Sequence, residues 1–125
     1  MAEAARGPGP VREGFAFDER RLEAWRRGNV EDFGGLRAVE QFGGGQSNPT
    51  YLLRGKDRDY VLRRKPSGPL LKGAHAIERE YRLMSALHPT GFPVPRPFGL
   101  CEDAEVIGTA FYVMEHVRGR TFWDT

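Results

Sequence analysis

The sequence has little cysteine, little net charge and no long apolar run. One cysteine among 125 residues, Cys101, excludes an internal disulfide framework and is compatible with a reducing compartment. The 19 basic and 17 acidic side chains leave a net charge of +2, which argues against nucleic acid or an anionic membrane as a partner. No apolar stretch approaches the roughly 20 residues that a membrane-spanning helix needs. The length suits one domain at most, without internal repeats.

The first residues lack the apolar core of a secretory signal. Met1–Gly14 is rich in Ala, Gly and Pro, and Glu3 and Glu13 argue against a mitochondrial transit peptide. We therefore expect residues 1–16 to be a disordered tail. We expect the protein to be cytoplasmic, with mitochondria or peroxisomes as alternatives for a eukaryotic homologue.

A glycine-rich segment lies between two stretches with strand composition. The stretches are Leu36–Phe42 and Pro49–Arg54, and the segment between them reads Gly43-Gly44-Gly45-Gln46-Ser47-Asn48. Glycine N–H groups can approach phosphate oxygens closely because no Cβ stands in the way. The segment therefore suggests a phosphate-binding loop. A flexible hairpin tip is the alternative, since glycine clusters are common in turns.

A third strand carries a run of cations. It covers Tyr60–Lys65 and follows the polar turn Gly55–Asp59, and connections this short require antiparallel neighbours. Side chains alternate between the two faces of a strand. The third strand therefore has Val61, Arg63 and Lys65 on one face, and Leu62 and Arg64 on the other.

Two segments have the signals of a helix. Asp18 is a typical N-cap, and the helix after it should end near Arg27, before Gly28-Asn29. The second segment runs from His75 to His88, and Pro89 ends it. Its apolar stripe consists of Ile77, Tyr81, Met84 and His88.

One carboxylate, Glu80, falls within the apolar stripe of the second helix. Burying an unpaired charge costs several kcal/mol, so a cation should meet it. Arg63 is the candidate, because the helix should cover that strand. The alternative is that Glu80 reaches water at the edge of the stripe or pairs locally. The solvated face should carry Glu78, Arg79, Arg82 and Ser85.

Two more strands are expected after this helix. The proline-rich residues 93–97 must form an extended connector, followed by strands at Phe98–Glu102 and at about Gly108–Glu115. The expected fold class is α+β. It has an antiparallel sheet of about five strands with one long packing helix, preceded by a short N-terminal helix.

This order of elements resembles the N-lobe of the protein-kinase-like fold, and most closely the aminoglycoside phosphotransferase-like family. The glycine loop of that family reads Gly-Gly-x-Ser-Asn before an aromatic-containing strand, as residues 44–51 do here. More narrowly, the chain resembles the N-terminal kinase-like domain of acyl-CoA dehydrogenase family members ten and eleven and their bacterial relatives. The strings that carry this resemblance are Ser47-Asn48-Pro49-Thr50, Tyr60-Val61-Leu62-Arg63, Ala74-His75, Glu78-Arg79-Glu80-Tyr81, Phe92-Pro93-Val94-Pro95, Val106-Ile107-Gly108-Thr109 and Phe111-Tyr112-Val113-Met114-Glu115-His116-Val117.

The resemblance implies roles for particular residues. Val61 would touch adenine, Arg63 would replace the phosphate-binding lysine, and Glu80 would orient it. Arg63 departs from the family pattern, which has a lysine here, because a planar guanidinium binds phosphate with a different geometry from a compact ammonium group. Lys65 is the alternative residue for the phosphate contact. The glycine loop lacks the spaced pattern of protein kinases, which favours a small-molecule kinase. Residues implied to close over the ATP phosphates are Gly43, Gly44, Gly45, Gln46, Ser47 and Asn48, and those implied at the adenine hinge are Met114, Glu115 and Val117.

The resemblance also implies what the chain does and what it lacks. Residues 17–117 would be the ATP-binding N-lobe, and residues 118–125 the start of a linker to a missing C-lobe. That lobe would hold the catalytic aspartate and the Mg²⁺ ligands, since only Asp124 follows Val117. We therefore expect no catalytic or metal-binding residue in the chain and no activity on its own. The implied function is that of the nucleotide-binding half of an ATP-dependent phosphotransferase for a small hydroxylated acceptor. The narrower resemblance suggests a hydroxyacyl-CoA of fatty-acid metabolism as that acceptor. The alternative is a non-catalytic kinase-like binding or regulatory module.

Overall fold

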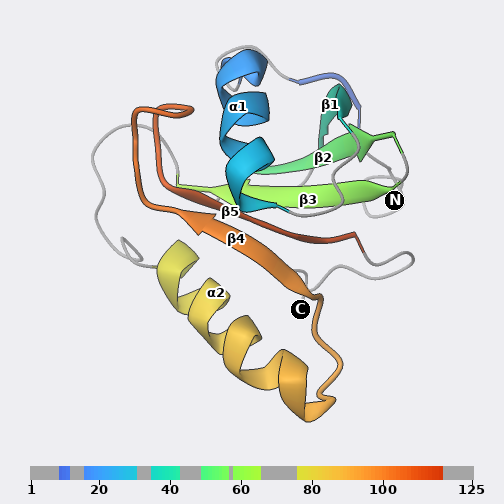
Figure 1. Cartoon of the computed structure of the whole chain (residues 1–125), viewed down its shortest axis with the longest axis vertical. Coiled ribbons are helices and arrows are strands. Elements are labelled where there is room, and N and C mark those ends of the chain that lie inside the picture. Colours follow the sequence, from blue (N-terminus) through green and yellow to red (C-terminus); the bar gives the residue numbers. More distant parts are fainter. Residues whose placement is uncertain are drawn as a thin grey trace, which may run out of the picture.

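The computed structural model describes residues 9–11, 16–30, 35–42, 49–56, 58–65 and 76–116. They form a five-stranded antiparallel sheet in the order β1-β2-β3-β5-β4, with one helix packed on each face (Figure 1). The sheet and the two helices confirm the expected α+β architecture. The elements are α1 (Glu19–Asn29), β1 (Leu36–Gln41), β2 (Thr50–Gly55), β3 (Asp59–Arg64), α2 (Ala76–Leu87), a 3₁₀ turn (His88–Thr90), β4 (Pro97–Cys101) and β5 (Phe111–Glu115).

Both helices form where the sequence indicates, but α1 runs to Asn29, past the predicted end near Arg27. Gly28 does not stop it, because the N–H of Val30 still donates to the carbonyl of Arg26 at 2.8 Å. A carboxylate oxygen of Asp18 accepts hydrogen bonds from the backbone N–H groups of Arg20 (3.0 Å) and Arg21 (3.4 Å), which confirms the N-cap of α1. Helix α2 gives way at Leu87 to a 3₁₀ turn that contains Pro89. Proline cannot supply the N–H that a continuing α-helix needs, so the helix ends where the sequence predicts.

The strand β5 begins later than predicted. It starts at Phe111 rather than near Gly108, because the chain before it is still turning. Gly108 has φ +100°, and its N–H donates to the carbonyl of Ala104 at 2.8 Å. A left-handed residue cannot lie in an extended strand. The strand β4 is shifted by one residue from the predicted span and covers Pro97–Cys101.

The α1 face of the sheet is packed with aromatic and aliphatic side chains. Trp25 of α1 meets the ring of Phe111 edge-on, with the ring centroids 4.9 Å apart. A Cβ added at Gly99 would lie 3.1 Å from Cη2 of Trp25, so glycine in β4 lets the indole approach the strand. The buried members of this core are Leu22, Val30, Tyr51, Leu53, Tyr60, Leu62, Cys101, Ile107, Phe111 and Val113.

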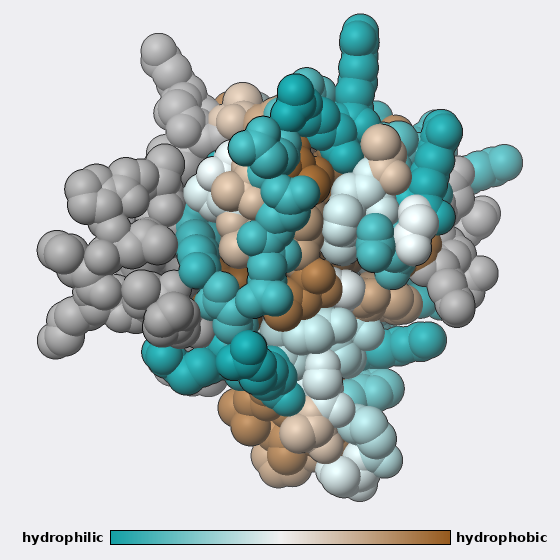
Figure 2. All heavy atoms as spheres, turned by 60° about the vertical axis from the view of Figure 1, so that its left-hand side comes forward, coloured by the Kyte–Doolittle hydropathy of each residue, from teal (hydrophilic) through white to brown (hydrophobic). Residues whose placement is uncertain are grey.

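The α2 face carries a smaller apolar cluster. Its buried members are Val61, Ile77, Tyr112, Met84 and Met114. The large apolar side chains that stay exposed, Leu83 and Phe92, belong to α2 and the turn after it. Figure 2 shows mainly hydrophilic surface in the upper half, where α1 lies, and more hydrophobic surface at the lower end, where α2 lies.

Several predicted features fall outside the described residues. They include the tail up to residue 8, the glycine segment 43–48 and the linker 118–125. Within the described part of the expected tail, Gly9 exchanges two backbone hydrogen bonds with Gln41 of β1. No helix in the described ranges is long and apolar enough to cross a membrane.

Candidate functional site

Three polar side chains share one cross-strand row of the sheet. Arg63 in β3 lies opposite Thr50 of β2 and opposite Tyr112 of β5. Residues that are paired across antiparallel strands project from the same face, which here is the face covered by α2. Glu80 of α2 meets this row, so side chains from three strands and one helix come together.

The centre of the site is the ion pair between Arg63 and Glu80. Nε of Arg63 donates to Oε1 of Glu80 at 2.9 Å, and Nη2 donates to Oε2 at 3.0 Å. The arginine side chain is 5% exposed and the glutamate side chain 27%. Two parallel N–H···O bonds make this a bidentate pair, the strongest form of such a contact. The pairing predicted from the helical stripe and the strand alternation is confirmed.

Two hydroxyl groups extend the pair in opposite directions. Nη1 of Arg63 donates to Oγ1 of Thr50 at 3.0 Å, and the hydroxyl of Tyr112 donates to Oε1 of Glu80 at 2.7 Å. Burial and the nearby charge of Glu80 raise the pKa of Tyr112, so its hydroxyl stays protonated and donates at neutral pH. Thr50 and Tyr112 were not predicted at this site from the sequence. Only the strand register would have revealed them, because it aligns both with Arg63.

A second ion pair joins α2 to the end of β3. Nζ of Lys65 lies 2.8 Å from Oε2 of Glu78, and these side chains are 17% and 9% exposed. The expectation that Glu78 lies on the solvated face of the helix is therefore wrong. Lys65 extends past the last residue of β3 and reaches the first turn of α2, where it supplies the cation that permits burial. Lys65 is thus engaged in holding the helix.

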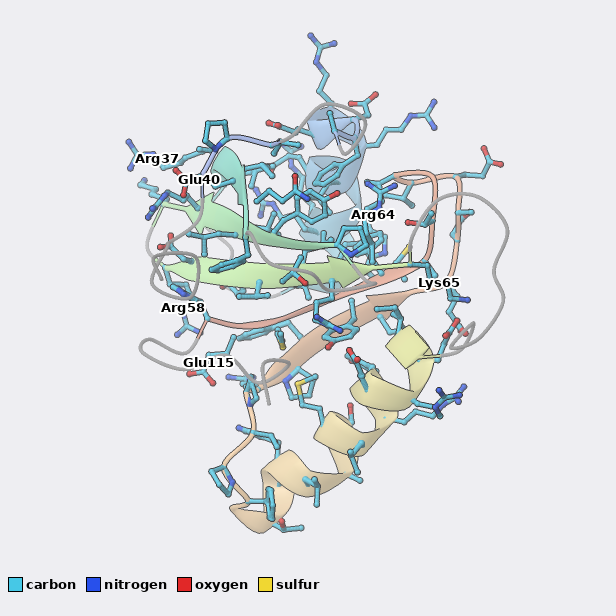
Figure 3. The ribbon with its side chains drawn as sticks, turned by 180° about the vertical axis from the view of Figure 1, so that it is seen from behind. Arg37, Glu40, Arg58, Arg64, Lys65 and Glu115 are labelled. Carbon is cyan, nitrogen blue, oxygen red and sulfur yellow. The ribbon has the colours of Figure 1, made fainter. Side chains whose placement is uncertain are left out.

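Arg64 points to the opposite face, as the alternation of the strand requires. Its Nε donates to Oγ1 of Thr109 at 3.0 Å, and Nη2 donates to the carbonyl of Ile107 at 3.2 Å. Its guanidinium also lies over the ring of Phe17, 5.6 Å from the centroid. Figure 3 shows Arg64 on the α1 side of the sheet and Lys65 near the start of α2. The three consecutive cations therefore bind three different sets of partners.

The residues predicted at the adenine side lie on the same sheet face as Arg63. Val61 and Met114 are opposite each other in register, and both are buried in the α2-side cluster. Glu115 is exposed at the other end of the sheet from Lys65 (Figure 3). Its backbone N–H donates to the carbonyl of Arg96 at 2.8 Å. The remaining predicted site residues, 43–48 and Val117, lie outside the described part of the chain.

Two other features of the described residues do not belong to this site. A shallow depression beside α1 lies on the other side of the sheet, and its lining includes Glu23, Arg27 and Leu36. Within the described ranges, no group of three or more His, Cys, Asp or Glu side chains could hold a metal ion. The carboxylates of Glu80 and Glu78 instead form ion pairs with Arg63 and Lys65.

The sequence from residue 38 to residue 125 matches the Phosphotransferase enzyme family (APH). The chain belongs to this family. Acyl-CoA dehydrogenase family member 11 of Gallus gallus is 47% identical over an alignment of 122 residues that covers 94% of this chain and 16% of that protein. Acyl-CoA dehydrogenase family member 10 of Mus musculus is 49% identical over 116 residues, which are 92% of this chain and 11% of that protein. The chain thus spans about a sixth or less of the length of these curated relatives.

A solved structure shows the same fold. The crystal structure of a candidate aminoglycoside phosphotransferase from Ralstonia eutropha matches with a TM-score of 0.72 and 52% sequence identity. The match covers 87% of this chain and 30% of the bacterial chain. It confirms the kinase-like N-lobe, and with the family match it shows that this chain corresponds to the N-terminal portion of a phosphotransferase.

Proposed function

We propose that this chain is the nucleotide-binding half of an ATP-dependent phosphotransferase. The observation that carries the proposal is the buried, bidentate Arg63–Glu80 pair between β3 and α2. Phosphotransferases of the kinase type use a strand cation that is oriented by a helix glutamate to bind ATP phosphates. In this family, a pair of this kind supports that role better than a purely structural one.

The geometry suggests which side of Arg63 meets phosphate. Glu80 occupies the edge formed by Nε and Nη2, whereas Nη1 lies toward Thr50. Thr50 is the first residue of β2, two positions after the glycine segment 43–48. The proposed phosphate site therefore lies on the Nη1 side of Arg63. Donors from residues 43–48 would close it, and adenine would rest against Val61 and Met114, with Glu115 and Val117 at its edge.

Magnesium would reach this site with the nucleotide. The described residues gather no carboxylates that fit a metal, so we assign no Mg²⁺ ligand to them. We assign residues 17–117 to the nucleotide-binding lobe and 118–125 to the connection toward a second lobe that would supply those ligands. The acceptor would be a small hydroxylated molecule. The acyl-CoA dehydrogenase names of the relatives suggest a hydroxyacyl-CoA. The free, buried Cys101 suits a reducing compartment such as the cytoplasm.

Titration of the chain with Mg²⁺–ATP, followed by amide chemical shifts in NMR, tests the nucleotide proposal. We expect shifts at Val61, Met114 and Glu115, and at least tenfold weaker binding by Arg63→Ala. Arg63→Lys keeps the charge and should retain part of the affinity. Arg54→Ala is the matched control, because Arg54 is half-exposed and pairs with Glu40 and Asp59 away from the site. Shifts confined to the depression beside α1 would contradict the proposal, as would equal effects of the Arg63 and Arg54 variants.

A further inference from the structure

The hydroxyl of Tyr112 is buried where a phenylalanine would fill the same space. Removing a hydroxyl from water is unfavourable unless it finds a hydrogen-bond partner. The partner of Tyr112 is Oε1 of Glu80, the same oxygen that accepts from Nε of Arg63. The ring itself is held in the sheet and lies against Tyr81 of α2, with centroids 5.9 Å apart. A rigid donor on β5 thus fixes one oxygen of a flexible helix side chain.

The contacts form a continuous chain from β2 to β5 through the helix. Thr50 accepts from one end of the guanidinium, Glu80 binds its other edge, and Tyr112 holds the carboxylate. A bidentate pair in isolation can still rotate as a unit, because nothing fixes its plane. Here the guanidinium cannot turn without breaking at least one bond to a side chain anchored in a strand. Fully connected polar networks of this type hold functional groups in a single orientation.

We propose that Tyr112 is a positioning residue for the phosphate-binding arginine: its hydroxyl fixes Glu80, and Glu80 fixes Arg63. Thr50 completes the same restraint from the other side of the guanidinium. This inference rests on the proposed function, because it assigns Arg63 to phosphate. It adds that the arginine is oriented before nucleotide arrives, by two hydroxyl groups outside the helix–strand pair.

Tyr112→Phe is the direct test, because it removes the hydroxyl and keeps the ring. Tyr60→Phe is the matched control, since Tyr60 is a fully buried tyrosine on the α1 side of the sheet. Two quantities are measured in the 125-residue chain: the hydrogen-exchange rate of the Arg63 Nε–H by NMR, and the dissociation constant of Mg²⁺–ATP. A hydrogen bond to a charged group is strong enough that we expect both to change about tenfold in Tyr112→Phe. Tyr60→Phe should change each by less than about twofold.

The paired measurements separate this proposal from the proposed function. If Arg63 exchanges faster and nucleotide binds more weakly in Tyr112→Phe alone, Tyr112 positions Arg63 for phosphate. If exchange speeds up while affinity is unchanged, Tyr112 has only a structural role and the inference is wrong; the same holds if Tyr60→Phe acts equally. If the wild-type chain binds no nucleotide, the proposed function fails, and faster exchange still establishes the restraint on Arg63. Thr50→Val provides a second variant with the same expected direction, should Tyr112→Phe fail to fold.

Discussion

The α1 face of the sheet is closed by an aromatic core, whereas the α2 face holds two ion pairs within a smaller apolar cluster. Arg63 and Arg64 illustrate the difference, since they are adjacent in sequence and both almost fully buried. Arg64 donates to a hydroxyl and a backbone carbonyl on the α1 side, and it ties β3 to the segment before β5. Arg63 donates to a carboxylate on the α2 side. The first arrangement stabilises the sheet, and the second also orients a charge.

The largest expected effect lies on the α1 face. Phe111→Ala removes a fully buried ring that contacts Trp25, and we expect a loss of about 3–5 kcal/mol in the free energy of unfolding. Urea unfolding measures it. Leu83→Ala is the control on the other side of the molecule, because Leu83 is largely exposed and should change stability by less than about 0.5 kcal/mol. Similar losses in the two variants would mean that the α1 face is not the main core.

The second comparison is between the two ion pairs of the α2 face. Removing one partner of a fully buried pair costs about 3–5 kcal/mol, and partial exposure reduces this to about 1–3 kcal/mol for Glu80→Ala and Glu78→Ala. Only Glu80→Ala should also weaken Mg²⁺–ATP binding, because Glu80 holds Arg63 in a bidentate pair whereas Glu78 pairs with Lys65. Calorimetric titration of both variants measures this. An equal loss of Mg²⁺–ATP affinity in Glu78→Ala would indicate that Lys65, the partner of Glu78, contacts the phosphates.

The sequence predicted the Arg63–Glu80 pair because two local periodicities met at one place. Alternation in the strand put Arg63 on one face, and the helical stripe turned Glu80 inward. Neither periodicity contains the strand register, so Thr50 and Tyr112 could not be placed beside the pair. Register depends on pairings between residues far apart in the chain, and here it decides which hydroxyl groups reach the charges.

Two predictions were wrong for other reasons: the exposure of Glu78 and the first residue of β5. Helical spacing places Glu78 away from Ile77 and Met84, and the ion pair with Lys65 compensates for burying its charge. The strand β5 was predicted from residue composition, which does not reveal the left-handed backbone at Gly108. In both cases a tertiary contact or a single dihedral angle overrode a pattern that was locally correct.

The smallest expected effect is electrostatic and lies at the rim of the α1 face. Glu23 of α1 forms an ion pair with Arg26, and its Oε1 accepts from the backbone N–H of Leu36 in β1 at 3.0 Å. The hydrogen bond from Arg26, supported by that from Leu36 and by the charges of Arg26 and Arg27, lowers the pKa of Glu23 against the opposing effect of burial. Because the folded pKa lies below the unfolded one, the carboxylate stabilises the fold above its unfolded pKa of about 4.3. This contribution is lost as the pH falls through the folded pKa.

Glu23→Gln should therefore destabilise the protein by less than about 1 kcal/mol at pH 7, as is usual for a pair near the surface. The difference from wild type should shrink steadily below pH of about 4 and vanish once Glu23 is protonated in both states. Urea unfolding at low salt across this pH range measures it, with Glu19→Gln as the exposed control on the same helix. A difference that grows toward acid pH would have the wrong sign for a lowered pKa. A difference near zero at every pH would instead show that the bond from Leu36, which a glutamine oxygen can also accept, outweighs the charge in joining α1 to β1.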